Sequence, residues 1–219
     1  MKPVRAVIFD MDGLMIDSER LYFEVEREIA SDYGKTVPET TLWKMMGRSP
    51  LEAVKIFVEE LGLPVSPKEL LEIRDGIMKQ KMLAELGPMP GLFDILRALD
   101  GKYALAVATG APTRFLDIAL DKLDIRRYFK VLQTSDGIAH GKPDPEIYLE
   151  TAKKLGLPPS ECAVLEDSSN GARSAKSAGC LTIAVPNEFT RLQDFSFVDK
   201  IVKNLFEASE YIARLTESV

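Results

Sequence analysis

Five short apolar runs are spread along the chain and alternate with segments of helical periodicity. Runs that are apolar at most positions and separated by helices are typical of strands buried on both faces of a parallel sheet. The pattern therefore predicts an α/β fold with a mostly parallel sheet. The expected strands cover residues 5–10, 103–110, 131–136, 162–169 and 181–186.

The segment between the first two expected strands differs, because its apolar residues have helical rather than strand spacing. They recur every four positions between Ser18, which we expect to cap a helix, and Gly34, which we expect to end it. Ser49 and Ser66 each open the pattern Ser-Pro-x-Glu, a capping box with proline at the first helical position. Residues 17–87 are therefore predicted to form a helical insert.

The insert divides the rest of the chain into two parts that we predict to form one core. With 219 residues, the chain is long enough for a sizeable core and a smaller inserted domain. We assign residues 1–16 and 88–219 to the core and residues 17–87 to the inserted domain. The large apolar side chains of the insert should fill its own interior rather than bind a cofactor; they are Trp43, Met45, Met46 and Phe57.

The composition is ordinary for a globular domain, with 46% hydrophobic and 28% charged residues. No apolar run approaches the ~18 residues that a membrane-spanning helix needs, and charged residues occur too early for a secretory signal. The formal net charge of −6 argues against a nucleic-acid or anionic-membrane partner, because phosphate contacts need clustered lysines and arginines. We therefore expect a cytoplasmic monomer that binds neither nucleic acid nor membrane.

The scarcity of histidine and cysteine excludes several catalytic classes. His140 is the sole histidine, so a serine or cysteine triad would have to use it, and histidine-rich zinc sites are impossible. Cys162 and Cys180 each border an apolar run and are expected to be small core residues. The GKT sequence at Gly34 is not a P-loop, because Ile29 occupies the position of the first glycine.

Asp10 ends the first expected strand, and Asp12 follows it with a single methionine between the two aspartates. An extended chain directs alternate side chains to the same side, so both carboxylates should lie together. Such a pair repels unless a cation, a shared proton or open solvent compensates it. Gly13 fits the turn that should follow. The alternative is a solvated junction between strand and loop, where aspartate and glycine are common turn residues.

Residues suited to bind phosphate or metal also stand at the ends of two further expected strands. Thr109 ends the second strand, and the adjacent acids Glu166 and Asp167 end the fourth. The carboxyl ends of parallel strands meet at one edge of the sheet, where open α/β sheets bind their ligands. We therefore expect these residues to lie beside Asp10.

Two helices are expected to begin near this edge. Asp144 and Pro145 are suited to the cap and the first position of one helix, and Lys142 lies just before them. The other helix follows Asp167 with a serine cap, and Gly179 should end it. Lys142 is therefore a candidate cation for the same site, with a solvated loop lysine as the alternative.

Four separated motifs occur in the order found in the haloacid dehalogenase (HAD) superfamily. They are DMDG at 10–13, Thr109 at a strand end, Lys142 in GKPDP, and ED at 166–167. On these residues the chain resembles a HAD hydrolase, in the subgroup that contains β-phosphoglucomutase and small sugar-phosphate phosphatases. The resemblance implies a doubly wound, mostly parallel, Rossmann-like sheet core with a four-helix cap domain inserted after the first motif.

The resemblance also implies a role for each matching residue. Asp10 would be the nucleophile that forms an aspartyl-phosphate, and Asp12 would act as general acid and then as general base. Thr109 and the Gly110 amide would hold the transferring oxygens, while Lys142 would neutralise charge on the phosphate and on Asp10. These roles would make the protein a phosphoric monoester hydrolase.

The same resemblance implies Mg²⁺ as the cofactor, with Mn²⁺ or Co²⁺ as substitutes. Asp10, the backbone carbonyl of Asp12, and Asp167 would supply the oxygen ligands that this ion prefers. Glu166 is expected to influence the ion through water. The cation would also relieve the repulsion between the carboxylates.

Substrate selection is expected to involve the inserted domain. Related mutases carry a histidine and an arginine there, and the matching positions here are Tyr22 and Pro50, with Arg48 two residues earlier. We expect Tyr22 and Arg48 to contact a small phosphorylated carbohydrate, such as a hexose or tetrose phosphate, which is then hydrolysed. The alternatives are a β-phosphoglucomutase-type phosphotransferase and a non-catalytic phosphate-binding module on the same fold.

Overall fold

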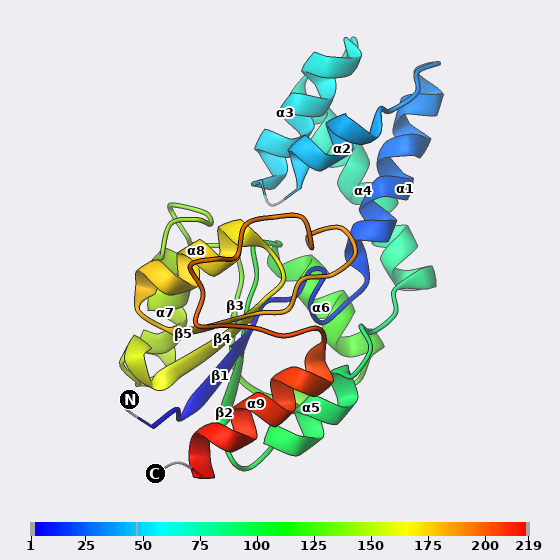
Figure 1. Ribbon diagram of the computed structural model, residues 1–219. Coiled ribbons are helices and arrows are strands. Elements are labelled where there is room, and N and C mark those ends of the chain that lie inside the picture. Colours follow the sequence, from blue (N-terminus) through cyan, green and yellow to red (C-terminus); the bar gives the residue numbers. More distant parts are fainter. Residues whose placement is uncertain (1–2, 47, 218–219) are drawn as a thin grey trace. The chain divides into compact units, whose positions relative to one another are not determined.

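The computed structural model describes residues 3–46 and 48–217 of the chain. The chain divides into two compact units, of which one comprises residues 1–16 and 87–219 and the other residues 17–86. The first is an α/β unit, and the described part of the second is helical (Figure 1). The roles of catalytic core and cap domain stay predictions.

A six-stranded parallel sheet forms the centre of the α/β unit, with the strand order β3-β2-β1-β4-β5-β6. After β1, the chain adds β2 and β3 on one side of that strand and then β4, β5 and β6 on the other side. The predicted doubly wound parallel sheet is therefore confirmed. The short strand β6 was not predicted, because two exposed residues carry no periodic signal. The strands are β1 (Ala6–Phe9), β2 (Ala104–Ala108), β3 (Phe129–Gln133), β4 (Cys162–Glu166), β5 (Leu181–Ala184) and β6 (Lys200–Ile201).

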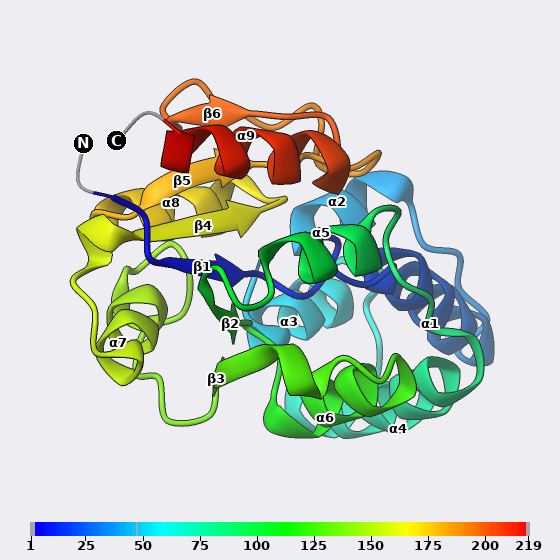
Figure 2. The same ribbon diagram turned by 90° about the horizontal axis from the view of Figure 1, so that it is seen from below.

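Helices cover both faces of the sheet (Figures 1 and 2). On one face, alternate strand residues such as Ile8 and Val164 pack against Tyr148 of α7 and Ala175 of α8. On the other face lie α5 and α9, which pack against each other. Short 3-10 helices cover Arg126–Tyr128 and Pro159–Glu161, and the α-helices of this unit are α5 (Leu92–Leu99), α6 (Thr113–Lys122), α7 (Glu146–Leu155), α8 (Ser169–Ala178) and α9 (Leu205–Glu217).

The two cysteines belong to the core on the α7 and α8 face. Cys162 and Cys180 are both buried and both carry free thiols. Burial raises the pKa of Cys162 to about 11 and that of Cys180 to about 12, so neither is a nucleophile at neutral pH. The expectation that they are small core residues is confirmed.

The helical unit contains α1 (Ser18–Asp32), α2 (Glu39–Met45), α3 (Pro50–Leu61) and α4 (Pro67–Glu85). The predicted capping box of α3 is present, because the Ser49 hydroxyl accepts from the Glu52 amide and the Glu52 carboxylate accepts from the Ser49 amide. At α4 the serine half of the predicted box is present, because the Ser66 hydroxyl accepts from the Glu69 amide. Among the described residues, no helix combines the length and apolar character needed to cross a membrane.

Two expectations about this unit are wrong. Ser18 does not cap α1: it is the first residue of the helix, Asp17 precedes it, and the buried Ser18 hydroxyl has no hydrogen-bond partner. Trp43 does not fill the interior, because it is 57% exposed, whereas Met45 and Phe57 are buried. The reason is helical geometry, since consecutive positions on α2 point about 100° apart and Leu42 already occupies the inward direction.

Candidate active site

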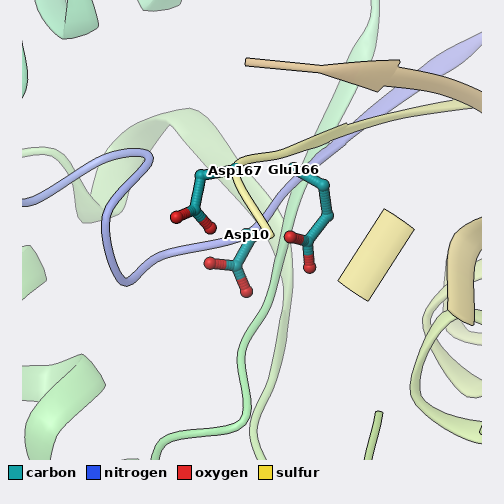
Figure 3. A group of neighbouring side chains, drawn as sticks. All are labelled: Asp10, Glu166 and Asp167. Atoms are coloured by element: carbon teal, nitrogen blue, oxygen red, sulfur yellow. The ribbon is translucent and has the colours of Figure 1, made fainter. Parts of the chain in front are cut away.

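The carboxyl edge of the sheet brings three buried carboxylates together. Asp10 follows β1, and Glu166 and Asp167 lie at the end of the neighbouring strand β4. The strand order changes direction between these strands, which is where open α/β sheets bind ligands. One oxygen of each carboxylate lies within 4.8 Å of the others. Figure 3 shows the three side chains directed to a common region, as expected from the strand ends.

Lys142 supplies the positive charge at this cluster. Its Nζ atom donates to Asp10 Oδ1 at 2.5 Å and to Glu166 Oε1 at 2.6 Å. Its side chain is only 12% exposed, so it is not a solvated loop lysine. Burial lowers the pKa of Lys142, but the two carboxylates outweigh burial and hold it well above its usual value. Lys142 is therefore positively charged in the folded protein.

Hydrogen bonds at the start of α7 fix the position of the loop that carries Lys142. The helix begins at Glu146, one residue later than expected, with Pro145 in the preceding position. The Asp144 carboxylate still accepts a hydrogen bond from the Glu146 amide at 2.9 Å. The Ser174 hydroxyl, on α8, donates to the Asp144 carbonyl at 2.6 Å. These bonds tie the lysine loop to both helices on this face.

Glu166 is completely buried, and both of its carboxylate oxygens accept hydrogen bonds. Oε1 accepts from Lys142 and from the Tyr148 hydroxyl at 2.8 Å. Oε2 accepts from the amide and the hydroxyl of Ser168, both at 3.1 Å. Because both oxygens already have donors, Asp10 and Asp167 are better placed than Glu166 to bind a cation directly.

Tyr148 is a site residue that sequence reasoning missed. Its ring is fully buried on α7, and the Lys142 ammonium lies 5.0 Å from the ring centroid. Burial and the Glu166 carboxylate raise the pKa of Tyr148 well above its usual value, so its hydroxyl remains a donor. In the sequence, this residue is one of several apolar positions on a helix, and nothing in that pattern indicates a polar contact.

The charges of the cluster fit a divalent cation. Burial raises the pKa of Asp10, with Glu166 and Asp12 adding to the effect and Lys142 opposing it. When all three carboxylates are ionised, they carry two more negative charges than the Lys142 ammonium balances. A dication would balance them, and carboxylate oxygens are the ligands that Mg²⁺ prefers. Asp10 and Asp167 are therefore suited to hold the implied Mg²⁺.

Asp12 is not one of the three clustered carboxylates, although it is close enough to contribute to the raised pKa of Asp10. The strand ends at Phe9, so strand periodicity does not extend to Asp12, and its carboxylate accepts a hydrogen bond from the Thr109 hydroxyl at 3.1 Å. Gly13 adopts a positive φ of 72°, as the expected turn requires. Gly110 follows Thr109 and is exposed. Asp12 and Thr109 are thus joined at the same edge of the sheet.

The two predicted substrate contacts lie in the helical unit. The Tyr22 ring stacks under the Arg74 guanidinium, whose carbon lies 4.7 Å from the ring centroid. Arg48 is exposed, and its Nε atom donates to the Lys44 carbonyl at 3.3 Å. Their contacts with substrate stay predictions.

Gly171 provides the space that Glu166 occupies, which leads to a stability prediction. A Cβ atom at residue 171 would lie 1.7 Å from Glu166 Oε1 and 2.0 Å from its carboxyl carbon. Gly171→Ala must therefore displace Glu166 from its partners, and we expect the free energy of unfolding to fall by about 1–3 kcal/mol in urea denaturation.

Gly76 is the matched control, because it is also a helical glycine but has no atom within 4 Å of an added Cβ. Gly76→Ala should stabilise its helix by about 0.5–1 kcal/mol. Equal effects of the two substitutions would contradict the close fit of Glu166 against Gly171.

The fold and the site together define an α/β enzyme whose acidic cluster and buried lysine stand at the switch point of a parallel sheet. Residues 7–185 match the model of the haloacid dehalogenase-like hydrolase family. The chain belongs to this family, and the resemblance inferred from its four motifs is confirmed.

Several similar proteins are phosphatases or phosphoglucomutases by name. A phosphorylated carbohydrates phosphatase of Thermotoga maritima is 39% identical over 178 residues, which cover 80% of this chain and 82% of that protein. The structure of a putative β-phosphoglucomutase from Thermotoga maritima is 34% identical, with a TM-score of 0.76 over 99% of this chain and 100% of that chain.

The structure of CbbY from Rhodobacter sphaeroides, in complex with phosphate, is 25% identical. Its TM-score is 0.84, over 93% of this chain and 96% of that chain. The family and the named relatives confirm the prediction of a phosphoric monoester hydrolase at the level of the reaction class.

Proposed function

We propose that the protein is a Mg²⁺-dependent phosphatase that hydrolyses small phosphorylated carbohydrates through an aspartyl-phosphate on Asp10. The observation that carries the proposal is the position of Lys142, whose ammonium contacts Asp10 and Glu166 at once. This contact favours the ionised form of Asp10 in a buried place and fixes the direction of its carboxylate. An ionised, oriented carboxylate is what nucleophilic attack on phosphorus needs.

In the first step, an Asp10 oxygen attacks phosphorus while the bond from phosphorus to the sugar oxygen breaks. Asp12 donates a proton to the leaving alkoxide, and its contact with the Thr109 hydroxyl holds the carboxyl group near the reacting atoms. Lys142 and the Gly110 amide stabilise the negative charge on the transferring oxygens. The products of this step are the free sugar and the aspartyl-phosphate.

In the second step, Asp12 takes a proton from water, and the water oxygen attacks phosphorus. The bond from phosphorus to the Asp10 oxygen breaks, which releases inorganic phosphate and restores the carboxylate. Asp10, the Asp12 carbonyl and Asp167 would hold Mg²⁺, which supplies positive charge to the phosphoryl group when bound. Glu166 keeps Lys142 directed at Asp10.

The substrate class rests on the relatives and on the helical unit. A relative that is 39% identical is named for phosphorylated carbohydrates, and another, from Escherichia coli, is named a fructose-1-phosphate phosphatase. Residues 17–86 would act as a cap, with Tyr22 and Arg48 contacting the sugar or a second phosphate. Few fixed cations on the cap should give broad specificity, since one apolar contact separates substrates by only about 1–3 kcal/mol.

A phosphoglucomutase-type transfer is the second candidate, because a similar structure that is 34% identical is named a putative β-phosphoglucomutase. The two reactions differ in whether water reaches the aspartyl-phosphate. We expect steady release of inorganic phosphate from hexose and tetrose phosphates in Mg²⁺, without any bisphosphate activator, and none when a chelator removes the ion.

The test is a phosphate-release assay across a panel of sugar phosphates, with β-glucose 1-phosphate plus β-glucose 1,6-bisphosphate as the mutase arm. Rapid bisphosphate-dependent formation of glucose 6-phosphate, with little free phosphate, would replace phosphatase by mutase. No turnover of any substrate in either arm would favour a non-catalytic phosphate-binding module.

A further inference from the structure

We infer that Asn187 is a positioning residue that holds the Asp167 carboxylate and the first acidic loop in the geometry needed to bind the cation. This inference rests on the proposed function. Asn187 lies in the loop after β5, which none of the family motifs named above includes.

A single amide group joins the two loops that carry the acidic residues. The Nδ2 atom of Asn187 donates to Asp167 Oδ2 at 3.0 Å and to the Gly13 carbonyl at 3.1 Å. Gly13 follows Asp12 directly, and its positive φ shapes the turn after the first motif. The Asn187 side chain therefore connects the loop after β1 to the loop after β4, and both connections come from a third loop.

The orientation of this amide is determined by its other end. Asn187 Oδ1 accepts from the backbone amides of Phe189 and Thr190, at 2.8 Å and 3.1 Å, and from the Thr190 hydroxyl at 3.3 Å. A flipped amide would direct its NH₂ group at these backbone donors. Only the observed orientation satisfies both ends, so the NH₂ group is held toward Asp167 before any ligand binds.

The chemistry of the amide suits a site that must attract a dication. A lysine or arginine in place of Asn187 would also donate to Asp167, but it would cancel part of the negative charge that binds the ion. An asparagine donates to the carboxylate without a formal charge, so it cancels none of the negative charge of the cluster. Groups of this kind orient metal ligands in many proteins, and their loss typically weakens metal binding about 10–100-fold.

The experiment compares Mg²⁺ binding and turnover in the full-length wild type and in Asn187→Ala. Binding is measured by calorimetry with Mg²⁺ and by electron paramagnetic resonance with Mn²⁺, neither of which depends on activity. We expect the Kd for either ion to rise about 10–100-fold, while kcat at saturating Mg²⁺ falls by a smaller factor.

Three further variants support the comparison. Glu188→Gln changes the charge of the neighbouring exposed residue and should leave the Kd within about twofold, because its effect is screened by solvent. Asp167→Ala should weaken binding more than Asn187→Ala. Thr190→Val removes the hydroxyl that donates to Asn187 Oδ1 and accepts from the Asn187 backbone amide, but it keeps the side-chain NH₂ group of Asn187. It should raise the Kd by less, which tests the inference if Asn187→Ala does not fold.

The outcomes separate this inference from the proposed function. Wild type that binds no divalent ion would overturn the Mg²⁺-dependent function itself. Wild type that binds the ion, with an unchanged Kd in Asn187→Ala or in Thr190→Val, would overturn only the role of Asn187. A lower melting temperature with an unchanged Kd would make Asn187 a structural residue of the loop and nothing more.

Discussion

Replacing Asp10 by asparagine is expected to abolish phosphate release while the protein remains folded. The substitution removes the nucleophilic oxygen but keeps the side-chain volume, and the amide oxygen can still accept from Lys142. Lys142 also keeps its second partner, Glu166. We therefore expect kcat to fall by at least about 10³-fold, with the free energy of unfolding changed by no more than about 1–2 kcal/mol.

The measurement is turnover of a hexose phosphate, with mass spectrometry to show that the new asparagine has not deamidated to aspartate. Asp94→Asn serves as the control, since Asp94 is an exposed partner of Arg97 and should contribute nothing to turnover. Activity of Asp10→Asn above roughly one percent of wild type would rule out a covalent mechanism through this residue.

Replacing Lys142 by methionine should affect both stability and turnover. The lysine is the single cation that an ion pair places among the three carboxylates of the described cluster. Without it, two buried carboxylates lose their partner, so the free energy of unfolding without divalent ions should fall by about 3–5 kcal/mol. Turnover at saturating Mg²⁺ should fall about 10²–10³-fold, because a group that stabilises the developing charge is lost.

Lys154→Met is the matched control for this substitution. Lys154 also lies in the α/β unit, but it is exposed, and its ammonium donates to the neutral Gln133 side chain at 2.7 Å. Its removal should leave turnover unchanged and cost only about 0.5–1.5 kcal/mol of stability. If Lys142→Met lowers stability and turnover no more than Lys154→Met does, Lys142 does not compensate the acidic cluster.

Most of the fold was predictable because its signals are local. The strands of the sheet, the cap serines of α3 and α4, and the glycines that end α7 and α8 follow from residue types at fixed offsets. The two wrong predictions concern positions where local sequence rules allow more than one outcome. The prediction that Ser18 caps α1 is wrong because Asp17 precedes the helix, and the prediction that Trp43 is buried is wrong because Leu42 already fills the inward direction.

The candidate site also contains some residues that local sequence signals predict and others that they do not. Asp10, Thr109, Glu166 and Asp167 were found from the sequence because each stands where a buried run ends, and parallel strands bring those ends to one edge. The part played by Tyr148 and Asn187 was not found. Tyr148 has the spacing of a core residue, and Asn187 lies in an irregular loop without periodicity.

The sequence by itself determined the parallel α/β sheet, the helical insert and the residues at the strand ends, because these depend on side-chain periodicity and on residues a few positions apart. Only the tertiary structure decided how the carboxylates share their donors. Lys142 reaches Asp10 across 132 positions of the chain, and Asn187 reaches Gly13 across 174. Contacts at such separations depend on how the strands and loops pack, and the direction of each hydrogen bond depends on the groups already occupied by others. Local periodicity carries no information about either.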